Sequence, residues 1–406
     1  MLDIFHDDTE DTVISDDRLH NSLILVVDDV ELGRKVIVHS LNARGFKNIV
    51  TAEDGSEALQ ITHARRPDLV VLDIMMPTMD GFAYLQAIRQ NDVFKNMPVI
   101  VQTALDDVEK KLKAFDLGAS DYVCKPIEPR ELAARTIVHL SKKLLMEDLT
   151  EYKKRMLVEL KMARLMQQRL MPSPTQLQMC ERVFNMKMGA YFETSSTLGG
   201  DCWGMRPISD NRIAIYIIDF SGHGISSSMN LFRMHTVMHE LQHAGGDPAN
   251  FLAALNRHLH PLLERDEFAT MFYGIIDTDA NCLLYASAAS TAPLLVSCAS
   301  GETTELSGRG FPLGAVANAT YDTKYTPFMA GDLLLLYSDA LIETNGYDGS
   351  LIDEEAIKEE IKSSNVINSD NPAQKIVEQL TKKFKAHNSA PIKDDLTITA
   401  YFRCAR

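Results

Sequence analysis

Polar side chains end several apolar runs in the first third of the chain. "LILVVDD" ends on Asp28 and Asp29, "DLVVLD" on Asp73, "PVIVQT" on Thr103 and "DYVCK" on Lys125. Three converging carboxylates would repel one another unless a hard cation such as Mg²⁺ lay among them. A carboxylate beside such a cation can attack phosphorus, and a lysine and a hydroxyl can hold the transferred oxygens. The set therefore predicts phosphoryl chemistry, although any one acid could simply cap the following helix.

The segments between these runs indicate how the polar residues come together. "VELGRKVIVHSLNARG" and "GSEALQITHARR" have the pattern of amphipathic helices, and they alternate with nearly continuous apolar strands. Such alternation predicts a parallel sheet with helices on both faces. In these sheets, functional groups gather at the carboxyl ends of the strands, where all five polar residues are expected.

Residues 22–140 resemble the CheY-like receiver domains of bacterial two-component response regulators. The motifs "VVDD", "LDIMMPTMDG", "QTA" and "DYVCKP" carry this resemblance. It implies a doubly wound, five-stranded parallel sheet, a cis peptide bond before Pro126, and a histidine kinase or phosphotransfer protein as partner. Its implied site residues are Asp28, Asp29 and Asp73 for Mg²⁺, Asp73 also for phosphorylation, Thr103 and Tyr122 as switch residues, and Lys125 for the phosphoryl group.

A second set of acids follows strand-like runs in the last 240 residues or so. "LGGDCW" contains Asp201, "IIDFSGHG" contains Asp219, "LYSDAL" contains Asp339, and "KDDLT" contains Asp394 and Asp395. Carboxylates that meet in one cleft cannot all stay ionised without cations, and two divalent ions could activate a water against a phosphoester. Asp before Gly or Ser is also ordinary turn chemistry. The ordered set, more than any one motif, favours a metal centre.

The strands and helices of residues 171–406 do not alternate as βαβ units. Strand candidates such as "RIAIYIID", "FATMFYGIID" and "DLLLLYSD" occur with two long helix candidates, so the pattern predicts an α+β domain of packed sheets.

This region resembles the type 2C (PPM) metal-dependent protein phosphatases. The likeness is greatest to the bacterial branch with the sporulation stage II and stress-response phosphatases, and "MARLMQQRLMP", "GFPLG" and "ATMFYGIID" also fit. The resemblance implies two stacked antiparallel sheets flanked by helices. It implies two Mn²⁺ or Mg²⁺ ions at the sheet edge, with catalytic ligands Asp201, Asp219, Asp339 and Asp394 and the carbonyl of Phe220; the role of Asp395 stays open.

Four positions are compared individually with the sequence pattern of this branch. Gly204 stands where the branch often has a second acid, Ser290 lies where it often reads "SAGH", and Ala340 replaces a common glycine. None of them removes an expected ligand, so they bear on substrate fit and turnover. His223, next to the acids, is expected to be structural because hard divalent ions prefer oxygen ligands.

Residues 141–170 predict a helical connector between the two domains. Apolar residues recur at steps of three or four, among them Leu149, Tyr152 and Met156, and no glycine or proline interrupts them. One apolar seam of this kind indicates either packing on the helix's own domain or a coiled coil with a second copy. The position between two globular blocks favours the coiled coil, so we expect a homodimer.

Composition limits the classes of function. The net charge of −15 argues against nucleic acid as a partner, and no basic recognition helix follows the expected receiver. Six scattered cysteines without a CxxC motif suit a reducing cytoplasm, and no apolar run has the length of a membrane span. Residues 1–21 are polar and acidic and predict a disordered tail.

These observations predict a response regulator in which phosphorylation of Asp73 controls a metal-dependent serine/threonine phosphatase. The resemblance implies a phosphoprotein substrate, an anti-sigma-factor antagonist. The alternative is a catalytically weak pseudophosphatase that works as an adaptor under receiver control.

Overall fold

The computed structural model describes residues 16–405, apart from 105–106, 223, 242–245, 298–299, 344–351, 353, 364–368 and 388–391. The chain divides into two compact units, an N-terminal unit Met1–Met156 and a C-terminal unit Leu157–Arg406. Among the described residues, no helix is both long enough and apolar enough to cross a membrane.

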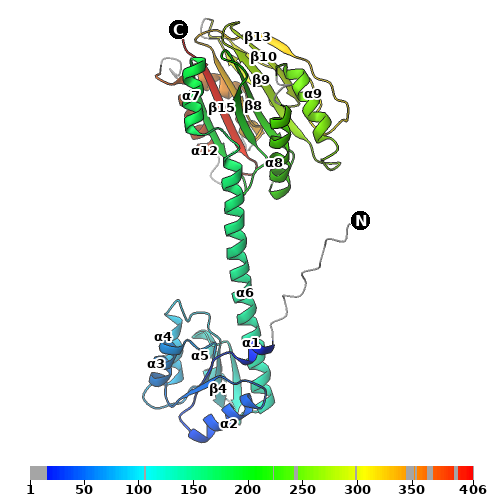
Figure 1. Cartoon of the computed structure of the whole chain (residues 1–406). Coiled ribbons are helices and arrows are strands. Elements are labelled where there is room, and N and C mark those ends of the chain that lie inside the picture. The colour runs from blue at the N-terminus through cyan, green and yellow to red at the C-terminus, as the bar shows by residue number, and fades with distance from the viewer. Residues whose placement is uncertain are drawn as a thin grey trace. The chain divides into compact units, whose positions relative to one another are not determined.

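The N-terminal unit is built on one parallel sheet with strand order β2-β1-β3-β4-β5 (Figure 1). Its strands are β1 (Ile24–Val27), β2 (Ile49–Ala52), β3 (Leu69–Asp73), β4 (Val99–Ala104) and β5 (Asp121–Lys125). The helices between them are α2 (Glu31–Asn42), α3 (Gly55–Arg65), α4 (Gly81–Arg89) and α5 (Val108–Asp116). This arrangement confirms the predicted doubly wound α/β fold.

Alternation along the strands explains why both faces of this sheet are covered. In β1, Leu25 and Val27 belong to one buried cluster, whereas Ile24 and Val26 belong to another. Successive side chains of a strand point to opposite faces, so a run that is apolar throughout needs a core on each side. The apolar strands therefore fix the sheet in the middle of the unit and leave its carboxyl edge for the polar residues.

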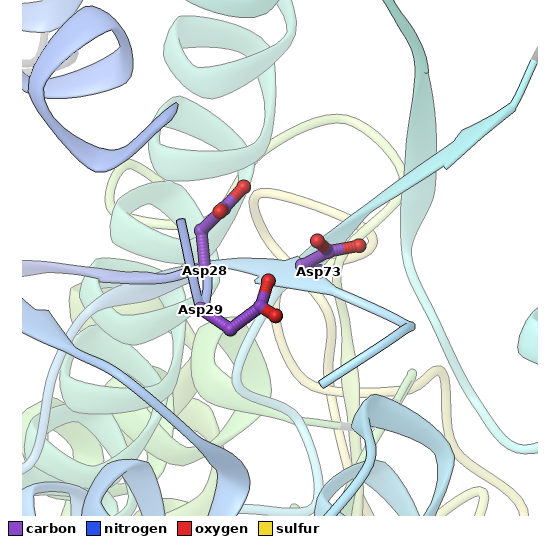
Figure 2. A group of neighbouring side chains, drawn as sticks. All are labelled: Asp28, Asp29 and Asp73. Carbon is purple, nitrogen blue, oxygen red and sulfur yellow. The ribbon is translucent and has the colours of Figure 1, made fainter. Parts of the chain in front are cut away.

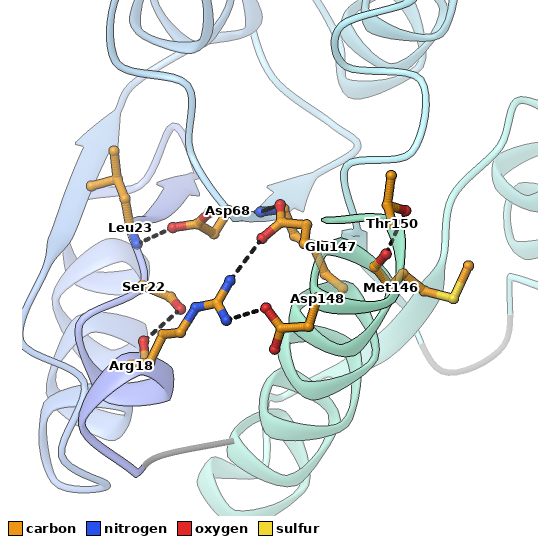
Figure 3. A network of polar contacts seen from close by, with 9 residues as sticks. Arg18, Ser22, Leu23, Asp68, Met146, Glu147, Asp148 and Thr150 are labelled. Atoms are coloured by element: carbon orange, nitrogen blue, oxygen red, sulfur yellow. Dashed lines mark hydrogen bonds and ion pairs between the residues drawn. The ribbon is translucent and has the colours of Figure 1, made fainter. Parts of the chain in front are cut away.

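A short helix, α1 (Asp16–His20), precedes β1 and contacts the long helix α6 (Pro129–Gln168). Leu19 is buried, and Arg18 forms ion pairs with Asp148 at 2.5 Å and Glu147 at 3.5 Å (Figure 3). The sequence predicts a disordered tail as far as residue 21, whereas residues 16–20 are helical and anchored by these contacts. Residues 1–15 lie outside the described part of the chain.

Helix α6 continues from the N-terminal unit into the predicted connector as one helix of 40 residues. Leu132, Leu140 and Leu144 are buried in the core of the N-terminal unit. Farther along, Leu149 and Tyr152 are 60% and 65% exposed. The first part of the helix therefore belongs to its own domain, whereas the apolar seam of the second part is left uncovered.

The C-terminal unit contains two five-stranded sheets, with strand orders β13-β10-β9-β8-β7 and β12-β11-β14-β15-β6 (Figure 1). All their strand pairs are antiparallel. The strands of the first sheet are β7 (Cys202–Pro207), β8 (Arg212–Phe220), β9 (Ala269–Asp277), β10 (Cys282–Ala288) and β13 (Lys324–Pro327). Those of the second are β6 (Met186–Glu193), β11 (Leu294–Val296), β12 (Thr303–Glu305), β14 (Leu333–Tyr337) and β15 (Leu396–Arg403).

Helices flank the two sheets. They are α7 (Pro174–Phe184), α8 (Ile225–Glu240), α9 (Pro248–Leu259), α10 (Ala340–Glu343), α11 (Glu354–Ser363) and α12 (Pro372–His387). Helices α8 and α9 cover the first sheet, and α12 covers the second. Helix α7 begins at Pro174, and Ser173 and Gln176 form a capping box at this end. The architecture confirms the predicted α+β fold of two stacked sheets.

Strand β8 shows how the apolar pattern sets the layers of this unit. Ile213, Ile215 and Ile217 point into the core between the sheets, whereas Tyr216 and Ile218 pack under the helices of the outer face. Because the side chains alternate, the next residue in the first series, Asp219, points toward the space between the sheets. The alternating pattern of β8 therefore places the carboxylate of Asp219 at the edge of the core between the two sheets.

Two candidate acidic sites

Three carboxylates of the N-terminal unit meet at the carboxyl edge of its sheet (Figure 2). Asp28 and Asp29 follow β1, and Asp73 is the last residue of the neighbouring strand β3. One carboxylate oxygen from each of the three residues lies within 4.8 Å of the other two. Asp28 and Asp73 are buried and Asp29 is exposed, so the cluster is open on one side. Hard divalent cations prefer such oxygen ligands, and the residues present fit Mg²⁺.

Lys125 provides the positive charge nearest to Asp73. Its Nζ lies 2.5 Å from Oδ2 of Asp73 and 3.4 Å from Oδ2 of Asp28. Burial raises the pKa of Asp73, and the charge of Asp28 adds to this, while Lys125 opposes it. For Lys125, burial acts to lower the pKa, but its bonds to the two acids outweigh this and raise the pKa. The lysine is therefore held as a cation beside the reactive acid.

The other expected switch residues lie on the neighbouring strands β4 and β5. Thr103 is buried near the end of β4, and its hydroxyl donates only a long 3.5 Å bond to the carbonyl of Ala104. Tyr122, on β5, makes an edge contact with Phe115 at 5.9 Å between ring centroids. The peptide bond between Lys125 and Pro126 is cis, as the sequence predicted.

Close backbone packing explains the glycine in "MDG". A Cβ atom on Gly81 would lie 2.3 Å from the carbonyl oxygen of Asp73. Any other residue would push the start of α4 away from the end of β3. The motif is therefore needed for the loop that carries Asp73 as well as for the acid itself.

In the C-terminal unit, Asp201 and Asp219 lie at the same end of two paired strands. Cys202 of β7 pairs with Ile218 of β8, and the two acids flank this pair. Burial raises the pKa of both acids, with that of Asp219 reaching about 7, and nearby carboxylates add to the rise. Such shifts are expected where acids converge without a compensating cation. Divalent ions fit this donor set.

Asp339 and Asp394 approach the same place from the second sheet. A shallow pocket is lined by residues of both sheets, among them Asp219, Asp339 and Ser290. Burial raises the pKa of Asp339, and Asp394 and Glu343 raise it further. Asp394 is exposed and accepts a 2.8 Å hydrogen bond from the backbone N–H of Asp395. The four acids expected from the sequence are therefore brought together.

The spacing of these acids differs between the two units. Among the described residues, only the N-terminal acids place three ligand oxygens within 4.8 Å of one another. The acids of the C-terminal unit lie at the ends of β7, β8, β14 and β15.

Asp395, whose role the sequence left open, binds backbone. It is buried, and its Oδ1 accepts hydrogen bonds from the N–H and hydroxyl of Ser195 at 2.7 and 3.0 Å. Its Oδ2 accepts a 2.6 Å bond from the N–H of Gly200. A Cβ atom on Gly199 would lie 2.2 Å from the same Oδ2. Asp395 therefore holds the loop that carries Asp201, and the glycines let it approach.

Two residues near Asp201 were missed by sequence reasoning. The hydroxyl of Thr397 donates a 2.6 Å hydrogen bond to Oδ2 of Asp201, and both side chains are buried. The amide of Gln167, near the end of α6, donates to the carbonyl of Gly199 at 2.7 Å and accepts from its N–H at 3.2 Å. A threonine in a strand and a glutamine in a helix carry no distinctive signal. Only the fold shows that they meet the acid loop.

The three departures have local explanations. A Cβ atom on Gly204 would lie 2.2 Å from the hydroxyl of Tyr216, so an acid would fit there only if that tyrosine moved. The Ser290 hydroxyl lies 2.9 Å from that of Ser287. Ala340 starts the helix α10 and has no left-handed backbone that would require glycine.

Among the described residues, no histidine lines the shallow pocket that contains Asp219 and Asp339. His235 and His239 lie on α8, away from the shallow pocket that contains Asp219. His223 and His243 lie outside the described residues, so the expectation that His223 is structural stays a prediction.

Comparison with known families identifies both halves of the chain. Residues 24–137 match the response regulator receiver domain, and residues 209–402 match the family described as Stage II sporulation protein E (SpoIIE). The chain joins a response regulator receiver to a SpoIIE-type phosphatase domain. The SpoIIE match contains Asp219, Asp339 and Asp394, while Asp201 lies before its first residue.

Relatives of the receiver are found among transcriptional regulators. A probable transcriptional regulator, ycf27, of Guillardia theta is 46% identical over 112 residues, which are 28% of this chain and 42% of that protein. The alkaline phosphatase synthesis regulatory protein PhoP of Bacillus subtilis is 40% identical over 115 residues, which are 28% of this chain and 47% of that protein. The chain thus spans less than half of the length of these relatives.

A solved structure resembles the phosphatase half. The SiaA-PP2C domain of Pseudomonas aeruginosa superposes with a TM-score of 0.54 at 18% identity, covering 63% of this chain and 99% of that one. At this identity the likeness establishes the fold of the phosphatase domain and nothing further.

Proposed function

We propose that the chain is a metal-dependent protein serine/threonine phosphatase whose activity is set by phosphorylation of Asp73. The observation that carries this proposal is the convergence of Asp219 and Asp339 from two sheets on one pocket of a SpoIIE-type domain. The receiver match and its three clustered carboxylates support the regulatory half.

In the receiver, Asp28, Asp29 and Asp73 would hold Mg²⁺, which when bound supplies positive charge for the incoming phosphoryl group. A carboxylate oxygen of Asp73 attacks the phosphorus of a phosphohistidine on a kinase or phosphotransfer protein. The phosphorus–nitrogen bond breaks, and an aspartyl phosphate forms. Lys125, whose Nζ lies 2.5 Å from Asp73, would pair with the new phosphoryl oxygens, and Thr103 would donate its hydroxyl to them.

In the phosphatase domain, Asp201, Asp219, Asp339 and Asp394 and the carbonyl of Phe220 would hold two Mn²⁺ or Mg²⁺ ions. When bound, these ions supply the charge that activates water against a phosphoester. A Cβ atom on Gly200 would lie 2.9 Å from the carbonyl oxygen of Phe220, so the glycine keeps that oxygen accessible. Thr397 fixes the rotamer of Asp201 by its hydrogen bond. Hydrolysis releases phosphate and restores the hydroxyl of the substrate.

The proposed substrate is a phosphoserine or phosphothreonine protein, and the resemblance to this branch points to an anti-sigma-factor antagonist. The proposed assembly is a homodimer that pairs the exposed seam of α6, and the proposed compartment is the cytoplasm. The second candidate function is a catalytically weak adaptor, which Gly204 favours because it replaces an acid common in the branch.

Hydrolysis and metal binding, measured separately, distinguish these functions. Purified full-length protein is given a phosphoserine peptide with Mn²⁺, with Mg²⁺ or with a chelator. If the protein is the proposed phosphatase, we expect turnover that depends on one of the two ions. Trp203, the only tryptophan, lies buried two residues after Asp201, and its fluorescence gives a second readout of metal binding. Metal-dependent fluorescence without turnover would support the adaptor, whereas no turnover together with no metal binding by calorimetry would contradict the metal-dependent phosphatase.

A further inference from the structure

A cavity of about 460 Å³ lies in the C-terminal unit apart from the acidic site. It is bounded by the chain after α6, by α7, by β7 and β8, and by α8. None of the proposed metal ligands lines it. Its volume falls within the range of cavities that bind small organic molecules.

The apolar part of this cavity is rich in methionine. Met171, Met179, Met205 and Met238 line it together with Phe251. Methionine side chains are unbranched and adapt their shape to an apolar ligand. The cavity can therefore accept apolar bodies that differ in outline.

The described charged side chains that line the cavity are all basic. Arg169, Arg206, His235 and His239 line it, and among the described residues no aspartate or glutamate does so. A cavity whose charged residues are all basic is unusual in a chain whose net charge is −15. Burial, followed by the neighbouring His239, lowers the pKa of His235 and favours its neutral form. The two arginines therefore carry the permanent charge.

Arg206 is held in place by a tyrosine hydroxyl and an aromatic ring. It donates a 3.3 Å hydrogen bond to the hydroxyl of Tyr273, and its guanidinium lies 6.0 Å from the ring centroid of Phe251. Across the described part of the chain, neither Arg206 nor Arg169 forms an ion pair with a carboxylate. A pre-positioned guanidinium with unused donors is well suited to a carboxylate or sulfonate.

Gly204 preserves both the space and the charge of this cavity. It lines the cavity, and an acid at this position would bring a negative charge beside Arg206. The glycine that departs from the branch is therefore explained by the cavity as well as by Tyr216.

We propose that this cavity binds an organic anion with an apolar body, of the class of medium-chain or aromatic carboxylates. The arginines bind the anionic group, and the methionines and Phe251 enclose the apolar body. The binding site is independent of the proposed phosphatase reaction and does not require it.

Two fluorescent probes of similar shape test the proposal on the full-length protein. Anilinonaphthalene sulfonate is apolar and anionic, whereas N-phenyl-1-naphthylamine is its neutral counterpart. We expect saturable binding of the sulfonate, which decanoate displaces and decan-1-ol does not. No saturable binding of the sulfonate, or equal displacement by decanol, would contradict the proposal.

Matched variants assign the binding to the cavity. Arg206→Gln should weaken binding of the sulfonate at least about tenfold, since it removes a charge-assisted contact. The neutral probe should change less than about twofold because its apolar contacts remain. Arg169→Gln is the second variant, and Arg265→Gln, at an exposed position outside the cavity, is the control. Partial unfolding would raise the fluorescence of the sulfonate, so a loss of binding cannot arise from misfolding. Unchanged affinity in both cavity variants would overturn the assignment.

Discussion

Burial raises the pKa of Asp219 to about 7, and the charge of Asp339 is the next largest contribution. An acid in this position is costly to ionise unless cations compensate for it. The carboxylate is therefore a poor structural residue but a suitable metal ligand. The same reasoning applies to Asp201, whose pKa is raised first by burial and then by Asp219.

Replacing Asp219 by asparagine keeps the shape of the side chain but removes its charge. We expect Asp219→Asn to lower phosphopeptide hydrolysis at least about a hundredfold, the scale for loss of transition-state charge stabilisation. The measurement is the turnover rate with saturating Mn²⁺. Asp210→Asn, at an exposed aspartate in the turn before β8, should leave the rate unchanged. Equal rates in the two variants would remove Asp219 from the site.

Gly204 offers a second test at single-residue scale. Its Cβ atom would lie 2.2 Å from the hydroxyl of Tyr216, whereas nothing lies within 4 Å of a Cβ atom at Gly246. Gly204→Ala should therefore lower the free energy of unfolding by roughly 1–3 kcal/mol, as overpacking does, and Gly246→Ala should not. Thermal or urea unfolding followed by circular dichroism measures both. A Gly204→Ala protein as stable as the wild type would show that Tyr216 moves freely.

At the scale of elements, the apolar strands made much of the fold predictable. In β1 and β3, runs without polar interruption can only be buried on both faces, which required the helices on either side. In the C-terminal unit, Asp219 near the end of β8 and Asp339 after β14 were visible because each follows an apolar run. Thr397 and Gln167 were not predictable, since their contacts join segments that are far apart in the sequence.

The exposed seam of α6 predicts self-association. Leu149, Tyr152 and Met156 are 60%, 65% and 43% exposed. Pairing with a second copy would remove this apolar surface from water. We expect Leu149→Asp and Met156→Asp to shift the protein from dimer to monomer in sedimentation experiments. Lys154→Gln changes the charge by the same amount on another face and should leave the dimer intact. A wild-type protein that is monomeric with and without a phosphoryl mimic would contradict the pairing.

At the scale of the whole molecule, phosphorylation of Asp73 must act on the phosphatase through α6, on our proposal. Lys125 and Thr103 can move to meet the added charge. Tyr122 lies on β5, which pairs with β4, and β4 pairs with the strand that carries Asp73. The phosphatase rate should differ at least several-fold between the two states, since allosteric coupling is typically ~1–3 kcal/mol. The direction is open, with activation favoured.

Beryllofluoride, which mimics the phosphoryl group, makes this coupling measurable. Hydrolysis is assayed with and without the mimic, in the wild type and in Asp73→Asn, which cannot carry the mimic. The expected change in rate should be absent from the variant. If the mimic leaves the wild-type rate unchanged, or alters the variant equally, the receiver does not control the phosphatase.

Because α6 is one continuous helix, the number of residues between two of its positions sets the angle between the directions in which they face. Each residue turns an α-helix by about 100° and advances it by about 1.5 Å, so seven added residues return a face to within about 20° of its starting direction. Three or four added residues change that direction by roughly 40–60°. If the signal travels as rotation of α6, a seven-residue insertion between Leu149 and Met156 should preserve control by beryllofluoride, whereas a shorter insertion should alter it. If the two insertions behave alike, length and not phase carries the signal.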